Sequence, residues 1–593
     1  MPAAGRIFAG SAAGAAIAAW VAPFLRPLFK VPAGGVGFVT VHGYPKGYDY
    51  AVVALLVGGA FVGGAVVALF ARREEVEPPA PDHRRRFVLA TAAIVLVTML
   101  FAHDHPYQLM DPFHEGEHLT PGFLLREGQR PFGEVFFLHG LAVDGGLDAL
   151  VLGDPPSPRR VRRLHTILDA SSLALLVLIA AELCFTRWGV AAAAMASLCG
   201  LAAGQLPTFP YHRLAPVLLG TFALLRFAKT GSTASAFVAM TSGTFGVLWS
   251  LDTGSYALAA VAVSLPIIRF ARVQQPAAPD GRRLLAAAAI ACVLPLLLLV
   301  GTGASIRHFV VDSFFRIPAA IDAVWALPAP APPSWKDMWR GNGESLRYYL
   351  PPVFYGALLA LALFHSRRGD RALAMRILVV AAMSIFLFRT ASGRSGWSHT
   401  RYGTALFGMA VVAFAIEPLF RRRRWVSGTL AAASLFLLVD VPSNASYLSR
   451  YLAGWRARQS HAGLVPYPLR TGKGIYTTPE YARDLAALNG FISTHSAPDA
   501  PIFDFAGERA IYYLLERRPP VRCFDINMLS APALKREALE QLAQNPPACV
   551  LLTGTSPPHD GVPFSTRVPE ISRWIDENYP RRQQIGRFLV ASK

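Results

Sequence analysis

The chain has 593 residues, of which 53% are hydrophobic and only 16% are charged, and its formal net charge is +19. Soluble globular proteins carry about 25% charged residues, so the composition excludes an ordinary soluble protein and indicates a large membrane protein. The positive charge does not indicate a nucleic-acid partner, because many Lys and Arg residues lie between apolar runs, as in cytoplasmic loops of membrane proteins.

Apolar runs dominate the first three quarters of the chain. A membrane-spanning helix needs about 20 mostly apolar residues, and about thirteen such runs can be read. They lie near 7–25, 51–71, 87–103, 166–185, 188–205, 213–228, 235–250, 254–270, 283–303, 350–365, 375–390, 402–420 and 425–441. The sequence therefore predicts an all-α multi-pass membrane domain over residues 1–441.

Arginine clusters between these runs predict the orientation. The clusters are Arg72, Arg73, Arg84, Arg85, Arg86, Arg282, Arg283, Arg367, Arg368 and the run from Arg421 to Arg424. If all of them face the cytoplasm, the N-terminus is cytoplasmic and the first run is retained as an anchor in the inner membrane. The opposite, outer side then receives segments 104–165, 204–213, 304–349 and 391–401, the turn around Asp252, and the tail.

The tail, residues 442–593, reads as a small extracytoplasmic α/β domain. Buried strands are expected at 501–505, 549–554 and 587–592, with helices at 481–495, 508–518, 533–544 and 570–579 between them. Cys523 and Cys549 fall in this domain, and the sequence leaves open whether they form a disulfide.

The first outer loop, 104–165, concentrates acids and histidines. Asp111 fits the N-cap of a short helix that begins at Pro112 and ends near Thr120, before Pro121 and Gly122. The apolar residues that follow are expected in helices lying flat on the membrane; they are Phe123, Leu124, Leu125, Phe132, Val135, Phe136 and Phe137. The stretch PRRVRR, 158–163, breaks the charge rule for an outer loop; long loops tolerate such charge, and a bound anion is the alternative explanation.

Other outer segments add cations and polar rings. They supply Tyr211, His212, Arg213, Asp252, Arg389, Arg394, His399 and Arg401. Each alone reads as an interfacial side chain, but charges gathered at a membrane boundary are often functional. Arginines suit a departing phosphate, and a carboxylate suits the proton of an attacking hydroxyl.

Two motifs resemble a known family. HEGEHLTPGFLLREGQRPFGEVFFLHG (114–140) and GRSGWSHTRYG (393–403) are similar to outer-loop motifs of the C superfamily of glycosyltransferases, in the branch of the protein mannosyltransferases and lipid A aminoarabinose transferases. Glu115 falls on the Glu of the family's Asp-Glu pair, where this chain has His114 in place of Asp.

The resemblance implies inverting transfer of a sugar from a polyprenyl-phosphate donor to an envelope lipid, glycan or protein. Asp111 and Glu115 would be catalytic and would hold a divalent cation such as Mg²⁺, Mn²⁺ or Ca²⁺ if one is used. Substrate would be bound by His114, Glu117, His139, Tyr211, His212, Arg213, Asp252, Arg389, Arg394, His399 and Arg401.

Two alternatives remain at this point. The spelling His114-Glu115-x-x-His118 is that of zinc proteases. A zinc protease carries the motif on a long helix, however, and this helix is expected to be short with Gly116 inside it, so His118 is expected to be a boundary side chain. A lipid-linked glycan transporter or polymerase would place facing charges in the membrane core, whereas these charges gather on one side.

Overall fold

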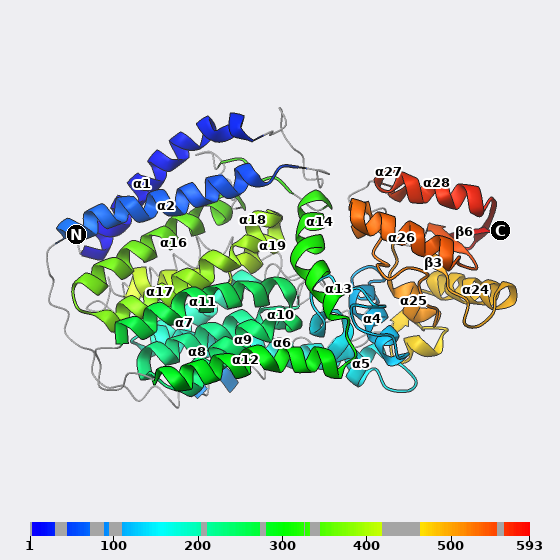
Figure 1. Cartoon of the computed structure of the whole chain (residues 1–593), viewed down its shortest axis with the longest axis horizontal. Helices are drawn as coiled ribbons and strands as arrows, with labels where there is room; N and C mark the ends of the chain where they lie inside the picture. The colour runs from blue at the N-terminus through cyan, green and yellow to red at the C-terminus, as the bar shows by residue number, and fades with distance from the viewer. Residues whose placement is uncertain are drawn as a thin grey trace.

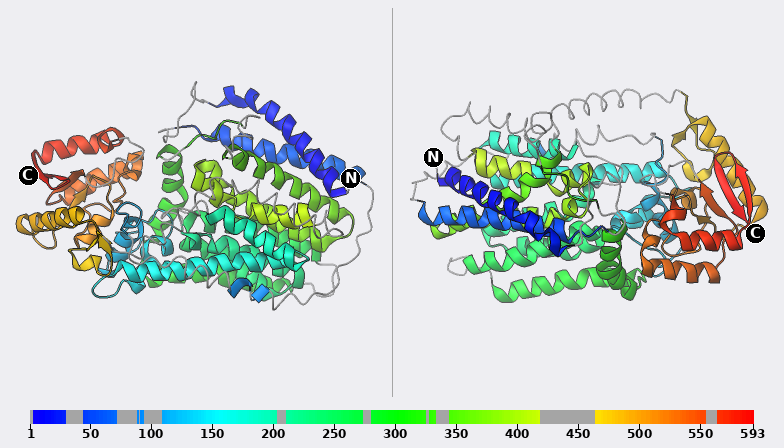
Figure 2. Two further views of the ribbon diagram at one scale, coloured as in Figure 1. Left: turned by 180° about the vertical axis from the view of Figure 1, so that it is seen from behind. Right: turned by 90° about the horizontal axis from the view of Figure 1, so that it is seen from above.

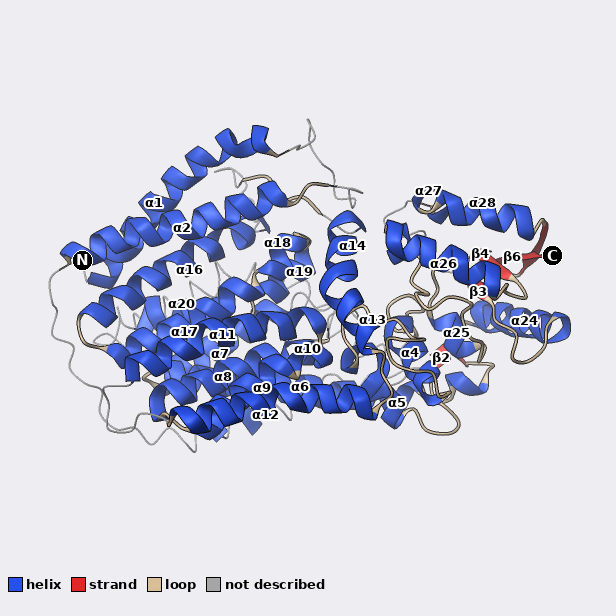
Figure 3. Ribbon diagram, in the orientation of Figure 1, coloured by secondary structure: helices blue, strands red, loops and turns tan. Residues whose placement is uncertain are grey.

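The computed structural model describes residues 3–29, 44–71, 88–89, 91–93, 109–202, 210–272, 280–324, 327–332, 344–417, 463–553 and 563–593. Figure 1 shows a bundle of long helices, with a smaller unit containing the C-terminus at one end of it. Figure 3 shows that the strands drawn in red lie in this smaller unit. We call the end of the bundle that carries the C-terminal unit the domain end, and the opposite end the far end.

Seven helices are long and apolar enough to cross a membrane, judged by length and composition. They are α1 (Ala3–Leu25, extended by η1, Arg26–Leu28), α2 (Gly47–Phe70), α6 (Pro158–Leu183), α11 (Leu251–Arg272), α12 (Gly281–Gly301), α16 (Glu344–Arg367) and α17 (Arg371–Leu387). Several apolar helices of this length indicate a multi-pass membrane protein.

The predicted count of thirteen spans is not confirmed among the described residues. Runs 87–103 and 425–441 lie mostly or wholly outside them. Four other runs form shorter helices: α7 (Arg187–Ala202), α8 (Ala215–Thr230), α9 (Thr233–Thr244) with α10 (Gly246–Trp249), and α20 (Phe407–Val411) with the π-turn η5 (Val412–Ile416). Within the described residues these helices are shorter than the usual span; α8 ends at the left-handed Gly231, and Ser250 separates α10 from α11.

The first two helices pack through glycines. An added Cβ on Gly14 of α1 would lie 2.1 Å from the carbonyl oxygen of Gly59 in α2, and one on Gly63 would lie 2.3 Å from that of Gly10. Without side chains at these positions the two backbones approach closely, which is how helices gain contact where lipid removes the hydrophobic drive for association.

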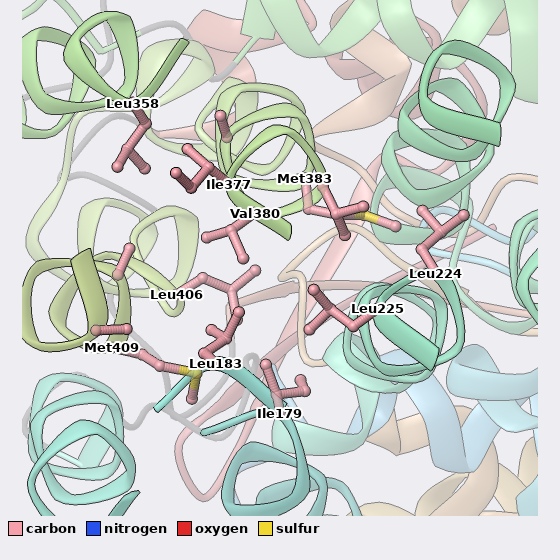
Figure 4. Close-up of a cluster of buried hydrophobic side chains, with 14 of the residues drawn as sticks. Ile179, Leu183, Leu224, Leu225, Leu358, Ile377, Val380, Met383, Leu406 and Met409 are labelled. Atoms are coloured by element: carbon pink, nitrogen blue, oxygen red, sulfur yellow. The ribbon is translucent and has the colours of Figure 1, made fainter. Parts of the chain in front are cut away.

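Apolar side chains fill the middle of the bundle. Figure 4 shows a part of this core, in which Leu183, Leu225, Val380 and Met409 come from four different helical segments and point toward one another. The buried leucines, valines and methionines position the helices whose ends carry the polar groups described below.

The far end carries part of the predicted cytoplasmic arginines. Arg367 ends α16, and Arg282 and Arg283 begin α12, on the side opposite to the C-terminal unit (Figures 1 and 2). Glu182 at the end of α6 pairs there with Arg226 and Lys229. The arginines of 72–86 and 421–424 lie outside the described residues, as does the expected domain boundary at 441.

The first outer loop ends earlier than predicted. Helix α6 already begins at Pro158, so the stretch PRRVRR is its first turns. Helix α4 (Gly116–Arg126) begins after the turn that Asp111 initiates and continues through Pro121, whereas an end near Thr120 was expected. After it come the π-turn η2 (Ala142–Gly146) and α5 (Leu147–Val151).

The apolar residues of this loop do not lie flat on the membrane, so that prediction is wrong. Phe132, Phe136 and Phe137 are buried in a core that is shared with the C-terminal unit. Burial against a neighbouring domain removes the same apolar surface from water that a lipid surface would have covered.

The C-terminal unit is an α/β domain, as predicted. Its sheet has the strand order β3 (Phe503–Asp504), β4 (Val550–Thr553), β6 (Phe588–Ser592), β5 (Arg581–Ile585), with β3 and β4 parallel and the rest antiparallel. The helices are α24 (Pro479–His495), α25 (Ala510–Leu514), α26 (Pro532–Gln544), α27 (Phe564–Arg567) and α28 (Pro569–Asn578), and a hairpin joins β1 (Val465–Pro466) to β2 (Tyr476–Thr477).

Two details of this domain differ from expectation. Strand β5 was missed because its sequence, RRQQI, is polar and mostly exposed at the sheet edge. Helix α25 is shorter than the expected 508–518, and Glu516, two residues beyond its end, takes a left-handed φ of 52°. Cys523 and Cys549 are both buried free thiols.

Candidate functional site

Backbone contacts join five segments that are distant in sequence at the domain end. The backbone N–H of Leu251 donates to the carbonyl of His139 at 2.5 Å, and the Trp249 indole donates to the carbonyl of His212 at 2.8 Å. Leu327 forms a backbone bridge with Arg394. The expected outer segments are therefore neighbours at one end of the bundle.

A cavity lies between the first outer loop and the C-terminal domain. Its lining residues are Glu117, Phe136, Leu138, His139, Asp144, Arg509, Phe524 and Asp525. Three carboxylates, one imidazole and one guanidinium therefore face a common space. The cavity is small, with about 20 Å³ of accessible space, which is room for about one water molecule.

Arg509 of the C-terminal domain holds one wall of this cavity. Its guanidinium pairs with Glu117 of α4 and lies 2.8 Å from Asp525, while stacking 4.0 Å from the centre of the Phe113 ring. Burial opposes its charge, but Asp525 and Glu117 outweigh burial and raise the pKa of Arg509. It therefore stays a cation inside the protein.

His139 and Asp144 form a dyad on the other wall. The His139 Nδ1–H donates to Asp144 Oδ1 at 3.0 Å, and the His139 backbone N–H donates to Oδ2 at 2.5 Å. This tautomer leaves Nε2 as a proton acceptor. Burial lowers the pKa of His139, but the Asp144 carboxylate outweighs it, so the net shift is upward.

A glycine allows the turn that carries Asp144. Gly145 in η2 has a φ of 116°, and an added Cβ would lie 2.4 Å from the backbone nitrogen of Gly122 in α4. Only glycine reaches this conformation without strain and fits this close approach. The sequence Asp-Gly-Gly thus fixes Asp144 beside α4.

Cations lie on the bundle side of the dyad. Arg213, in the 3₁₀ turn η3 (Tyr211–Leu214), donates to Asp252 Oδ2 at 2.8 Å. His399 of α19 (Trp397–Gly403) lies within electrostatic range of Arg213, Asp252 and His139. Burial first, and then the charges of Arg394 and Arg213, hold the pKa of His399 well below its usual value, so its ring is neutral.

The expected catalytic pair, Asp111 and Glu115, makes local contacts instead. Both Glu115 oxygens accept from Arg162, at 2.7 and 2.9 Å, and Oε1 also accepts the Asp111 N–H at 2.9 Å. The oxygens of Asp111 accept from Phe113 and His114. Protein donors contact all four oxygens of this pair, so a divalent cation bound there would compete with them.

One arginine of the stretch PRRVRR is neutralised by a carboxylate of the protein itself. Arg162, the fifth residue of that stretch, binds Glu115 of the same outer loop. The two histidines of the His114-Glu115-x-x-His118 motif have different partners in the structure. His114 contacts Asp111 at 2.6 Å and precedes α4, whereas His118 lies on α4 and contacts Asp148 at 2.5 Å. The two histidines therefore do not form the paired ligands of a zinc protease.

His118 is not a boundary side chain, contrary to expectation. With Asp148 of α5 and His165 of α6 it forms a group whose nitrogen and oxygen atoms all lie within 4.8 Å of one another, a spacing that can hold a metal ion. Within the part of the chain that the structure describes, this is the group of histidines and carboxylates with such a spacing.

The remaining predicted residues contact other parts of the bundle. His212 is buried and bonded to Asp169 at 2.7 Å, and Tyr211 is buried in the apolar core. Arg389, in the short α18 (Arg389–Gly393), stacks 4.5 Å from the centre of the Tyr50 ring. Arg401 is buried and donates to the carbonyl of Gly200.

Sequence reasoning missed five residues of these groups. They are Asp144, Asp148, His165, Arg509 and Asp525. The glycine pair after Asp144 was a usable signal for a special turn. Arg509 and Asp525 carry no such signal, because their role follows from how the C-terminal domain docks on α4.

Comparisons with known proteins do not identify the activity of this chain. No protein-family model and no curated protein matches the chain. Among solved structures, the chain is similar to the arabinosyltransferase EmbB from Mycobacterium smegmatis, determined by single-particle cryo-EM, with 14% sequence identity and a TM-score of 0.33. The match covers 74% of this chain and 47% of the other, so the chain spans about half the length of that arabinosyltransferase. A match this low carries no argument about activity.

Proposed function

We propose that this chain is a membrane glycosyltransferase that moves a sugar from a polyprenyl-phosphate donor to an acceptor hydroxyl at the domain end. The observation that carries the proposal is the meeting of the His139–Asp144 dyad with Arg213 and His399 at one end of an apolar bundle. The resemblance of two sequence motifs to those of the C superfamily of glycosyltransferases supports the same reaction.

The dyad accepts the proton in this reaction. The acceptor oxygen attacks the anomeric carbon, the bond from that carbon to the phosphate oxygen breaks, and the electron pair leaves with the phosphate. His139 Nε2 takes the acceptor's proton, while Asp144 keeps the imidazole in the required tautomer and stabilises the imidazolium. The upward shift of the His139 pKa means that the site stabilises the imidazolium that this proton transfer forms.

Arginines face the leaving phosphate. Arg213 is buried and held by Asp252, and Arg394 is placed beside Leu327 on the neighbouring segment. Burial opposes the charge of Arg213, but Asp252 outweighs burial and raises its pKa, so the cation persists. A guanidinium that is already positioned stabilises the charge of a departing phosphate at little reorganisation cost.

In this proposal Asp111 and Glu115 stabilise the first outer loop and do not accept the proton of the acceptor hydroxyl. Arg162 occupies both Glu115 oxygens and thereby fixes the start of α4 to α6. The proposal therefore moves the base from these residues to the dyad, which follows α4 in the chain.

The domain end faces the extracytoplasmic side in this proposal. Arg282, Arg283, Arg367 and Arg368 near the far end agree with the positive-inside rule. The N-terminus would then be cytoplasmic, the protein would lie in the inner membrane, and the acceptor would be an envelope lipid, glycan or protein. A reporter fused after Lys593 that is active only in the cytoplasm would contradict this orientation.

The test is donor consumption by the full chain in lipid nanodiscs. A panel of polyprenyl monophosphates, each carrying one sugar, is incubated with an acceptor extract, and released polyprenyl phosphate is measured by mass spectrometry. His139→Gln and Asp144→Asn should each slow release by about 10²–10⁴-fold. His495→Gln, at an exposed site on α24, is the matched control and should leave the rate unchanged. Wild-type protein that consumes no donor of the panel would contradict the function, and a fully active His139→Gln would contradict the role of the dyad.

A further inference from the structure

Three helices meet around one buried carboxylate. Asp148 of α5 is 0% exposed, and its Oδ2 lies 2.5 Å from His118 Nδ1 of α4. Its Oδ1 lies 2.8 Å from His165 Nε2 of α6. Neither the dyad of His139 nor the cavity of the proposed reaction includes these three side chains, so the proposed function leaves them without a role.

The spacing of the three ligand atoms fits one metal ion. In a tetrahedral zinc site with ligand bonds of about 2.0–2.2 Å, ligand atoms lie about 3.4 Å apart. His118 Nδ1 and His165 Nε2 contact different oxygens of Asp148, at 2.5 and 2.8 Å, and one ligand atom from each of the three residues lies within 4.8 Å of the others.

The chemistry of the ligands selects the class of ion. Two imidazoles and one carboxylate suit zinc and the neighbouring first-row divalent ions, whereas Mg²⁺ and Ca²⁺ prefer sets made of oxygen. A fully buried carboxylate also needs a compensating positive charge, which a divalent ion supplies in full.

A fourth histidine provides an independent observation. The ring of His212 lies 4.7 Å from that of His165, and its Nδ1–H donates to Asp169 at 2.7 Å. That bond leaves Nε2 as a buried lone pair, with no hydrogen-bond partner among the described residues. A histidine whose other ring nitrogen donates to a carboxylate is the usual arrangement next to a metal.

We propose that His118, Asp148 and His165 bind one zinc ion that fastens α4 and α5 to the start of the membrane helix α6. The ligands come from all three elements, and His118 lies one residue after Glu117 of the cavity wall. The metal site therefore fixes where α4 presents Glu117. Its role is positional, and it is distinct from a protease site built on His114 and His118.

The first experiment measures metal content. The full chain is purified in detergent with a tag that contains no histidines, and its metals are quantified by mass spectrometry. Wild type should contain about one zinc per chain, and His118→Ala and His165→Ala should contain almost none. His114→Ala, four residues before His118 and outside the group, is the matched control and should keep the zinc.

The second experiment needs no variant, so it decides the question even if a variant fails to fold. Wild type is stripped with a chelator and reloaded with Co²⁺, which should give visible absorption bands of a tetrahedral site, and Zn²⁺ should displace them. Stripping should also lower the unfolding temperature by several degrees, and zinc should restore it.

Opposite results would show a plain hydrogen-bonded triad. Protein that takes up no zinc or Co²⁺, and whose unfolding temperature is unchanged by chelator, would overturn the proposal. Metal content and unfolding are measured without any donor, so a failed glycosyl-transfer assay does not affect this outcome, and a metal-free protein leaves the dyad's role open to its own test.

Discussion

Two junctions in this molecule both depend on glycine, and they differ in everything else. In the α1–α2 hairpin, Gly14 meets the backbone of Gly59 inside an apolar helix pair. At the junction of α4 with α25, Gly116 meets the backbone of Ala510, where an added Cβ would lie 2.1 Å from the nitrogen, and buried ion pairs surround this contact.

The difference follows from what surrounds each junction. Two membrane helices gain contact only from close packing, since lipid is as apolar as their side chains. The α4–α25 junction instead joins a polar loop to a separate domain, and Arg509 bonded to Glu117 and Asp525 admits one docking geometry. Close packing of backbones holds α1 against α2, whereas buried ion pairs fix the position of α4 relative to the C-terminal domain.

The largest effect should come from removing the charge at the α4–α25 junction. Arg509→Ala leaves Glu117 and Asp525 buried without their cation, and breaking a buried pair in this way costs about 3–5 kcal/mol of unfolding free energy. Thermal unfolding of the full chain in detergent, with limited proteolysis between α4 and the C-terminal domain, measures it. A variant as stable and protease-resistant as wild type would show that packing alone makes this junction.

A smaller loss is expected from filling the backbone contact. Gly116→Ala forces α4 away from Ala510, and overpacking of this kind costs about 1–3 kcal/mol. Gly490→Ala on α24 is the control, because no atom lies within 4 Å of its added Cβ, so it should stabilise the helix by up to about 1 kcal/mol. Equal effects of the two substitutions would mean that the contact at Gly116 is not needed.

The C-terminal domain should also respond to pH. Burial, and then the charge of Glu508, raises the pKa of Asp504 to about 8 from an ordinary value of 3.8. Between these values the folded domain keeps a proton that the unfolded chain has lost. Stability should therefore fall by about 1.4 kcal/mol for each unit that pH rises, until the folded carboxyl has ionised.

Hydrogen exchange of the β3 and β4 amides, followed between pH 5 and 8 and corrected for intrinsic rates, reports this slope. Asp504→Asn should flatten it, while Asp576→Asn on exposed α28 should not. An unchanged slope in Asp504→Asn would assign the pH dependence to another group.

The smallest effect should come from an exposed ion pair. Arg470 pairs with Glu516 at 2.5 Å, but its side chain is 62% exposed. Solvent screens such a pair, so Arg470→Ala should cost about 0.2–1 kcal/mol. If Arg470→Ala lowered the unfolding free energy as much as Arg509→Ala, burial would not determine how much an ion pair contributes to stability in this protein.

The sequence predicted which segments form helices and strands better than it predicted how those segments contact one another. Eleven of the apolar runs fall on described helices, and three strands of the C-terminal domain were placed from their buried residues, because hydrophobicity and periodicity are local properties. The polar strand β5 and the continuation of α4 through Pro121 were missed, since an edge position and a docking partner decide them.

The site shows the same limit. His139, Arg213, Asp252 and His399 were selected from the sequence, and the structure brings them together. The partners that assign roles were not foreseen, because Arg162 reaches Glu115 across 47 positions and Arg509 reaches Glu117 across 392. Residue type predicts which side chains matter, but only folding decides which charges neutralise one another.

The start of α4 has a mechanical consequence. Glu115 is bound to Arg162 of α6, Glu117 to Arg509 of the C-terminal domain, and His118 to Asp148 of α5. Three residues at the start of α4 thus contact three different elements: α6, the C-terminal domain and α5. Rotation of α4 about its axis would break all three contacts together, so that degree of freedom is frozen. The three contacts therefore resist rotation of α4 relative to α5, α6 and the C-terminal domain.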